Sequence, residues 1–277
     1  MARALGLPGG ADPSEYTDVF VLHLYPYASV YLGAEGMLGA EAADRVAGFW
    51  RALHLAPPAE PDHLAALLGL YAGLADREAE DGDGARRLLS RHARTALLHE
   101  HLVSWLPPYL DRLEALAPPA CRAWGALLRS ALWEETEVLG APRALSAHLQ
   151  AAPPLPDPRR DGSHAFVAGL LAPVRCGMIL TRADLARAAR DLELGLRVGE
   201  RKFAIAALLS QAPGAVLGWL AAEATRCAVQ HDAHAGVMGP MAHFWAERAE
   251  HTARVLHDLR DSAVKDTAES KGAEVTP

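Results

Sequence analysis

The sequence predicts an all-α protein, and two observations lead to that fold class. Apolar residues recur at the helical spacing i, i+3, i+4, i+7 from Val46 to Leu53, from Leu64 to Tyr71 and from Leu98 to Trp105. Runs with strand character are confined to residues 19–22 and 30–32, and a proline separates them. Each apolar stripe needs a partner surface, so we expect helices packed on helices.

The elements of the first half follow from local signals. Residues 20–40 contain Pro26 and two glycines, and we expect a mostly extended loop with turns at Gly33 and Gly36. Asp62 is suited to cap the helix that begins near Leu64. Pro107 is expected to end the helix that carries Trp105.

The second half begins after a proline-rich stretch. Residues 151–163 hold four prolines, and we expect a non-helical linker. Thr181 and Asp184 have the spacing of a capping box. The most apolar stretch, 203–222, is interrupted around Pro213, so it predicts two buried helices rather than a membrane span. A last helix is expected from about Met241 to Leu259.

These signals divide the chain into four parts. We expect a helical core at 1–140, a Pro-rich linker at 141–163, a C-terminal helical segment at 164–260 that packs on the core, and a disordered tail at 261–277. The N-terminus lacks an apolar run before the first proline, so no signal peptide is expected.

The composition limits which classes of partner the protein is expected to bind. The chain has 277 residues and 29.6 kDa, is 51% hydrophobic, and carries 27 Lys+Arg against 34 Asp+Glu, a net charge of −7. Residues 1–150 hold 12 Arg and 19 acids, which is −7, whereas the rest holds 15 of each sign and is neutral. This balance disfavours nucleic acid and favours a short cationic peptide as a partner of the first half. Three widely spaced cysteines give no zinc knuckle and no disulfide framework, and suit a reducing cytosol.

Catalytic motifs are missing from the sequence. There is no GxSxG, GxxxxGK[ST] or GxGxxG, so neither a nucleophile elbow nor a phosphate loop is predicted. Histidines cluster at His99 and His101 and at His231 and His234, but a third metal ligand is not evident. We therefore predict no catalytic residues, no metal and no cofactor, and keep a helical metal- or cofactor-binding protein or enzyme as the alternative.

Three motifs lie in order along the first half. The first reads Pro-Tyr-Ala-Ser-Val-Tyr-Leu and includes Ser29 and Tyr31. The second is Glu60-Pro61-Asp62-His63 at a helix start. The third is His-Leu-Val-Ser-Trp-Leu-Pro, with Trp105. Together they would offer aromatic surface and negative charge.

In these motifs the chain resembles the TorD/DmsD/NarJ family of cytoplasmic chaperones for molybdenum-containing oxidoreductases. The family has a stretch like P-[WY]-x-S-V-Y-L, an E-P-x-D-H-like helix start and an H-L-x-x-W-x-P segment. The second motif is one residue shorter here between proline and aspartate. The resemblance covers roughly residues 25–139.

The resemblance implies an all-α maturation chaperone that is not an enzyme. Such a protein binds the twin-arginine signal peptide or the apo-form of a molybdopterin oxidoreductase subunit and holds it in the cytoplasm until the cofactor is inserted. The implied signal-peptide-binding residues are Asp62, His63, Trp105, Tyr31, Ser29 and Glu60. No membrane span or nucleic acid is expected, and the protein is a monomer or a dimer. We expect Asp62→Ala to weaken peptide binding and leave the fold intact, because a helix cap contributes only about 1 kcal/mol.

The chain departs from the family before the first motif. Family members have several helices there, whereas only about 24 residues precede Tyr25. Residues 201–222 weakly resemble the family's opening helices. We therefore expect a single bundle-like globule of the TorD type in which the C-terminal helices take the place of the missing N-terminal ones, and a separate accessory domain is the alternative.

Overall fold

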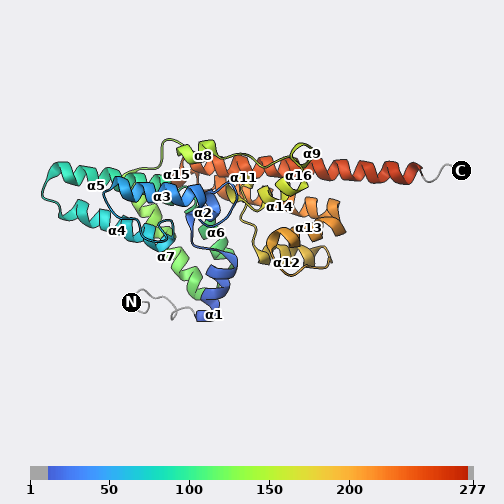
Figure 1. The fold of residues 1–277 in the computed structure, drawn as a ribbon, viewed down its shortest axis with the longest axis horizontal. Helices are drawn as coiled ribbons and strands as arrows, with labels where there is room; N and C mark the ends of the chain where they lie inside the picture. The colour runs from blue at the N-terminus through green and yellow to red at the C-terminus, as the bar shows by residue number, and fades with distance from the viewer. Residues whose placement is uncertain (1–11, 274–277) are drawn as a thin grey trace. The chain divides into compact units, whose positions relative to one another are not determined.

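The computed structural model describes residues 12–273, with side chains for residues 12–262 (Figure 1). The described residues are helical almost throughout and form no strand beyond one isolated bridge between Tyr27 and His63. The prediction of an all-α fold is confirmed. No helix in this described part is long and apolar enough to cross a bilayer.

The chain divides into two compact units. Unit 1 comprises residues 1–152 and 233–244, and unit 2 comprises residues 153–232 and 245–277. The last helix, α16 (Pro240–Ala273), begins in the segment assigned to unit 1 and continues in unit 2. The expectation that residues 164–260 complete the core of the first half stays a prediction.

Unit 1 is built from helices that pack as neighbours along the chain, chiefly α4 against α5 and α6 against α7. Its elements, two of them π-helical and named η, are α1 (Pro13–Tyr16), η2 (Thr17–His23), α2 (Ala28–Leu32), α3 (Ala40–Ala52), α4 (Leu64–Glu80), α5 (Gly84–Ala96), η3 (Leu97–Leu102), α6 (Leu106–Leu116), α7 (Pro119–Leu139), α8 (Ala147–Ala151) and α15 (Ala235–Met238). Leu67, Leu97, Leu102, Tyr109 and Leu113 are fully buried in its core.

Unit 2 has a core of its own, made by Ile205, Leu208, Leu220 and Ala221 together with residues of α10 and α16. Its other elements are α9 (Pro158–Asp161), α10 (Ser163–Leu170), α11 (Pro173–Cys176), α12 (Arg182–Asp191), α13 (Arg201–Gln211) and α14 (Pro213–Asp232). The predicted capping box is present, since Thr181 Oγ1 accepts from the Asp184 amide and the Asp184 carboxylate accepts from the Thr181 amide. Pro213 begins α14, as its position predicted.

One close approach in unit 2 requires a glycine. Gly177 follows α11 with φ of +70°, a left-handed conformation that glycine adopts at little cost. A Cβ at this position would lie 2.3 Å from the Ala249 amide nitrogen of α16. The two backbones therefore touch where no side chain fits.

The prediction of an extended loop at residues 20–40 is wrong for two parts of that segment, because η2 runs to His23 and Ala28–Leu32 is the helix α2. Residues 24–27 and 33–39 are non-helical, and the predicted turn between Gly33 and Gly36 is present, since the Gly36 amide donates to the Gly33 carbonyl at 3.0 Å. A helix of five residues has almost no intrinsic stability. α2 forms because a side chain from a distant part of unit 1 satisfies one of its first amides, as described below.

Two helix boundaries differ from expectation, and the stretch 151–163, predicted to be non-helical, contains a short helix. Pro107 lies in the first turn of α6, directly after its first residue Leu106, and does not end a helix, since proline lacks the amide hydrogen that a first turn leaves unused. In the predicted linker, Asp157 accepts from the Arg159 amide and caps the short helix α9. At the C-terminus α16 continues to Ala273, whereas its predicted end was near Leu259. The N-terminal residues 1–11 and the last four tail residues, 274–277, lie outside the described part, and with them the expectations for a leader and for the end of the tail.

Candidate functional site

The first two sequence motifs meet in space at the starts of α2 and α4. The Ala28 amide donates to the Asp62 carbonyl at 3.1 Å, and the Leu64 amide donates to the Pro26 carbonyl at 2.8 Å. Tyr27 and His63 form the isolated antiparallel bridge between the two segments. Residues 33 or more positions apart in the sequence are thereby fixed side by side, and we call this place the junction.

Asp62 is the residue that joins the two helix starts. Its side chain is buried, with 3% of the residue exposed, and its Oδ2 accepts from the Ser29 amide at 3.0 Å. It therefore caps α2, 33 residues earlier, and not its own helix. His63 caps α4 instead, because its Nδ1 accepts from the Ala65 amide at 3.1 Å. Asp62 caps a helix, as predicted, but that helix is α2 and not α4.

Ser29 continues the same network. It is fully buried, and its hydroxyl oxygen accepts from the Gly39 amide at 3.1 Å, which anchors the turn that follows α2. The chain leaves α2 through Gly33, where a Cβ would lie 2.6 Å from the Ser29 carbonyl oxygen. Only glycine allows this exit without a backbone shift.

Tyr31 and Trp105 form an aromatic cluster with Tyr109 beneath the junction. The rings of Tyr31 and Trp105 are stacked with centroids 5.2 Å apart and an interplanar angle of 8°, and Tyr109 meets both edge-on. The Tyr31 hydroxyl donates to the Tyr25 carbonyl at 2.8 Å, and the Trp105 indole donates to the His101 carbonyl at 2.8 Å. All three rings are buried, so the cluster is core that supports the junction from inside.

The solvent-facing residues of the junction are Tyr27, Glu60 and His63. Glu60 is exposed, and Tyr27 and His63 are partly exposed. The Tyr27 ring meets the His63 ring edge-on with centroids 4.7 Å apart. The pKa of Tyr27 is raised, first by partial burial and then by a hydrogen bond to Glu60 and the negative charges of Glu60 and Asp62. These three side chains, which we call the junction surface, combine a carboxylate with two amphipathic rings.

The structure thus separates the six predicted site residues into two groups. Ser29, Tyr31, Asp62 and Trp105 are buried, and their role in this conformation is to hold the junction. Glu60 and His63 reach the surface. Tyr27 belongs to the first motif but is not among the six predicted site residues, because the sequence does not show which members of that motif face solvent.

The histidines behind the metal hypothesis have other neighbours. His99 Nε2 lies 2.9 Å from the Gly140 carbonyl oxygen, and His231 Nε2 lies 2.8 Å from the Gly177 carbonyl oxygen. His234 Nε2 lies 2.8 Å from the Asp111 carboxylate. Among the residues that the structure describes, no group of three or more histidines, cysteines and acids is placed to hold a metal ion.

His101 is buried beside Arg45. Burial first, and then the charge of Arg45, lowers the pKa of His101 to about 4. This histidine is therefore neutral at pH 7 and stays neutral well below it.

A comparison with family models matches residues 13–111 to the nitrate reductase delta subunit family. No curated protein and no solved structure matched the chain in the corresponding comparisons. The matched segment contains the junction and all six predicted site residues. Over this segment, which is about a third of its length, the chain is similar to nitrate reductase delta subunits, a family of TorD-like chaperones.

Proposed function

We propose that the protein is a maturation chaperone for a molybdopterin oxidoreductase. The nitrate reductase delta family is known for molybdoenzyme maturation chaperones, and the match to it is the observation that carries the proposal. The protein would bind the twin-arginine signal peptide, the apo-form of the catalytic subunit, or both. It would hold this client in the cytoplasm until the cofactor is inserted.

The junction surface is the proposed contact for the signal peptide. The Glu60 carboxylate would accept from an arginine of the twin pair, and the rings of Tyr27 and His63 would cover the apolar part of the peptide. The guanidinium is also attracted to the faces of aromatic rings. The backbone that carries these three surface side chains would be held in place by the buried residues Asp62, Ser29, Tyr31 and Trp105. No catalytic step is part of this function.

The test is peptide binding with the charge of the peptide varied. A fluorescent twin-arginine peptide is titrated with the full chain beside its Lys-Lys variant, and anisotropy gives the two affinities. The Arg-Arg form should bind more tightly, because a guanidinium makes two parallel hydrogen bonds to a carboxylate and an ammonium does not. Equal affinity for both peptides would mean that the protein does not distinguish arginine from lysine, and it would then be a helical adaptor without peptide specificity.

A second arm locates the contact on the chain. Glu60→Gln should weaken Arg-Arg binding about two- to fivefold, the range of an exposed ion pair, and Tyr27→Ala should weaken it further. Glu137→Gln is the matched control, since Glu137 is an exposed acid of α7 without an ion pair in the described structure. If Glu137→Gln weakens binding as much as Glu60→Gln, the junction surface is not the contact.

A further inference from the structure

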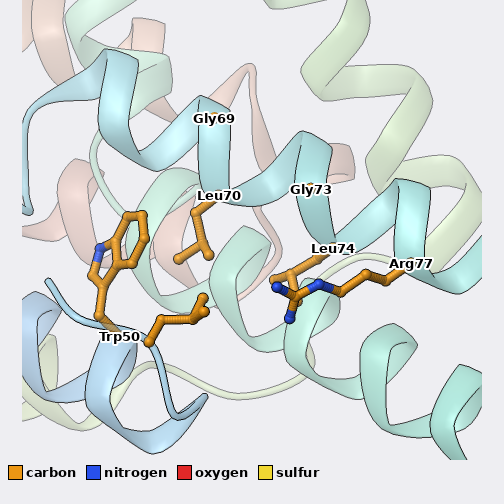
Figure 2. A pocket seen from close by; sticks show the side chains of 7 residues that line it. Trp50, Gly69, Leu70, Gly73, Leu74 and Arg77 are labelled. Atoms are coloured by element: carbon orange, nitrogen blue, oxygen red, sulfur yellow. The ribbon is translucent and has the colours of Figure 1, made fainter. Parts of the chain in front are cut away.

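An open cavity of about 200 Å³ lies between α3 and α4 in unit 1, and none of its lining residues belongs to the junction (Figure 2). Trp50 of α3 and Leu55, which follows that helix, form one wall. Leu70 and Leu74 of α4 form the other. These four side chains make the cavity mainly apolar, and Figure 2 shows Trp50, Leu70 and Leu74 directed toward the same space.

Two glycines leave the α4 side of this groove open. Gly69 and Gly73 are one helical turn apart, both line the cavity and both are exposed. A Cβ built on either would meet no atom within 4 Å. Glycine in a helix interior costs about 1 kcal/mol relative to alanine, so the local fold does not explain these two. Paired small residues at this spacing let a second helix approach the backbone closely.

Arg77 ends the groove one turn beyond Gly73. Figure 2 shows its side chain extending from α4 back toward Leu74 and the cavity. Arg77 is exposed and has no ion pair among the described side chains. Its neighbours on α5 differ, because Arg91 and Arg94 both pair with Glu78. The groove therefore combines apolar walls with a cation that has no internal anion.

We propose that this groove binds an amphipathic helical segment of a partner protein, with a carboxylate one turn beyond its apolar face. Gly69 and Arg77 are eight positions apart, or about 12 Å along α4, which is about two helical turns and fits anchors at i, i+3, i+4 and i+7. The carboxylate pairs with Arg77. The junction surface favours a cationic segment, so the groove has the opposite charge preference and is a second site, beyond the proposed function.

The probe is a synthetic amphipathic helical peptide with leucines at i, i+3, i+4 and i+7 and one glutamate, beside its twin with lysine in place of glutamate. The labelled peptides are titrated with the full chain. We expect the glutamate peptide to bind two- to fivefold more tightly, as for an exposed ion pair, and Arg77→Glu to reverse that order. Arg87→Glu, at an exposed and unpaired arginine of α5, should leave the order unchanged.

Gly69→Leu fills the groove and should weaken both peptides at least tenfold. Gly48→Leu is its matched control, because Gly48 is an exposed helical glycine of α3 with nothing within 4 Å of a Cβ and lies outside the groove. Circular dichroism verifies that both variants fold, which the gain in helix propensity favours. Neither variant should change twin-arginine peptide binding, so the outcome is separate from that of the proposed function.

Four results would overturn the proposal. The first is that neither peptide binds, and the second is that Gly69→Leu binds both as well as the unmodified chain does. The third is equal affinity for the glutamate and lysine peptides. Concentration-dependent self-association that Gly69→Leu abolishes would assign the groove to a second copy of this chain and would also overturn it.

Discussion

Replacing Asp62 by alanine should destabilise unit 1 and not merely remove a surface contact. The Asp62 carboxylate accepts from the Ser29 amide inside the protein, where water has little access. Alanine leaves that amide without an acceptor and removes the cap of α2. The same junction holds Tyr27 and His63 in register, so the surface above it would loosen too.

The size of the effect follows from the burial. A buried amide left unpaired costs about 1–3 kcal/mol, and a lost helix cap about 0.5–2 kcal/mol. These describe one interaction and are not added, so we expect a loss of about 2 kcal/mol. For a domain of about 150–250 residues, 1 kcal/mol shifts the melting temperature by about 2–4 °C, which gives a fall of about 4–8 °C. This exceeds the small effect that the sequence alone suggested.

Thermal and urea unfolding followed by circular dichroism measure this loss. Asp62→Asn should recover part of it, because the amide oxygen of asparagine still accepts from the Ser29 amide. Asp83→Ala is the matched control, since Asp83 caps α5 from an exposed position and should cost less. If Asp62→Ala and Asp83→Ala unfold at the same midpoint, or if Asp62→Ala loses peptide binding with unchanged stability, Asp62 is a contact residue and the reasoning fails.

Three further predictions concern stability. His101→Gln should make the free energy of unfolding less sensitive to acid. The pKa of His101 is about 4 in the folded state and about 6.5 in the unfolded state, so between these values the unfolded state binds more protons. The free energy of unfolding of the unmodified chain therefore falls as the pH drops from about 6.5 to about 4. Urea unfolding at pH 7.5 and pH 5 should show the unmodified chain losing about 2 kcal/mol more than the variant. Gly177→Ala should lower the melting temperature of unit 2 strongly, by a cost of about 2–3 kcal/mol or more, because its Cβ would overlap the Ala249 backbone. Tyr31→Phe should cost about 1 kcal/mol in urea unfolding, for the lost bond to the Tyr25 carbonyl, and leave twin-arginine affinity unchanged.

Each of these has an outcome that would contradict it. Equal acid sensitivity in His101→Gln would mean that folding does not lower the pKa of His101. Gly214→Ala is the control for Gly177→Ala, as its Cβ meets no atom within 4 Å, and similar melting of the two variants would contradict the close approach. A large loss of peptide binding in Tyr31→Phe at preserved stability would place Tyr31 in the contact surface.

Periodicity predicted the long helices because their signal is repeated over many residues. α3 and α4 were expected from Val46, Leu64 and their periodic neighbours, and both helices are present. α2 could not be predicted in this way. It has five residues, and its cap comes from Asp62, which is distant in the sequence. The helix propensities of residues 28–32 give no indication of the hydrogen bond from the Ser29 amide to Asp62.

The same limit explains why the site could be predicted only in part. The motifs identified residues that come together, but not which of them face solvent. Trp105 illustrates this, since its helical spacing after Leu98 fits a buried stripe and a groove equally well. η3 ends at Leu102, and Trp105 directly precedes α6, which turns its ring onto Tyr31. The burial of Trp105 thus depends on a helix break and on a partner ring from α2.

The structure indicates where the excess negative charge of residues 1–150 lies. Several of its acids are neutralised inside unit 1, as Glu78 is by Arg91 and Arg94 and Asp111 is by Arg129. A pair of opposite charges contributes nothing to the net charge, so the surplus must lie on unpaired acids such as the exposed Glu60. Such charges act on a cationic peptide through solvent and are screened within about 8 Å at physiological salt. Affinity should therefore fall with added salt, and Glu60→Gln should reduce that salt dependence more than a remote acid does, if the peptide contacts the junction surface and is not merely attracted by the whole unit.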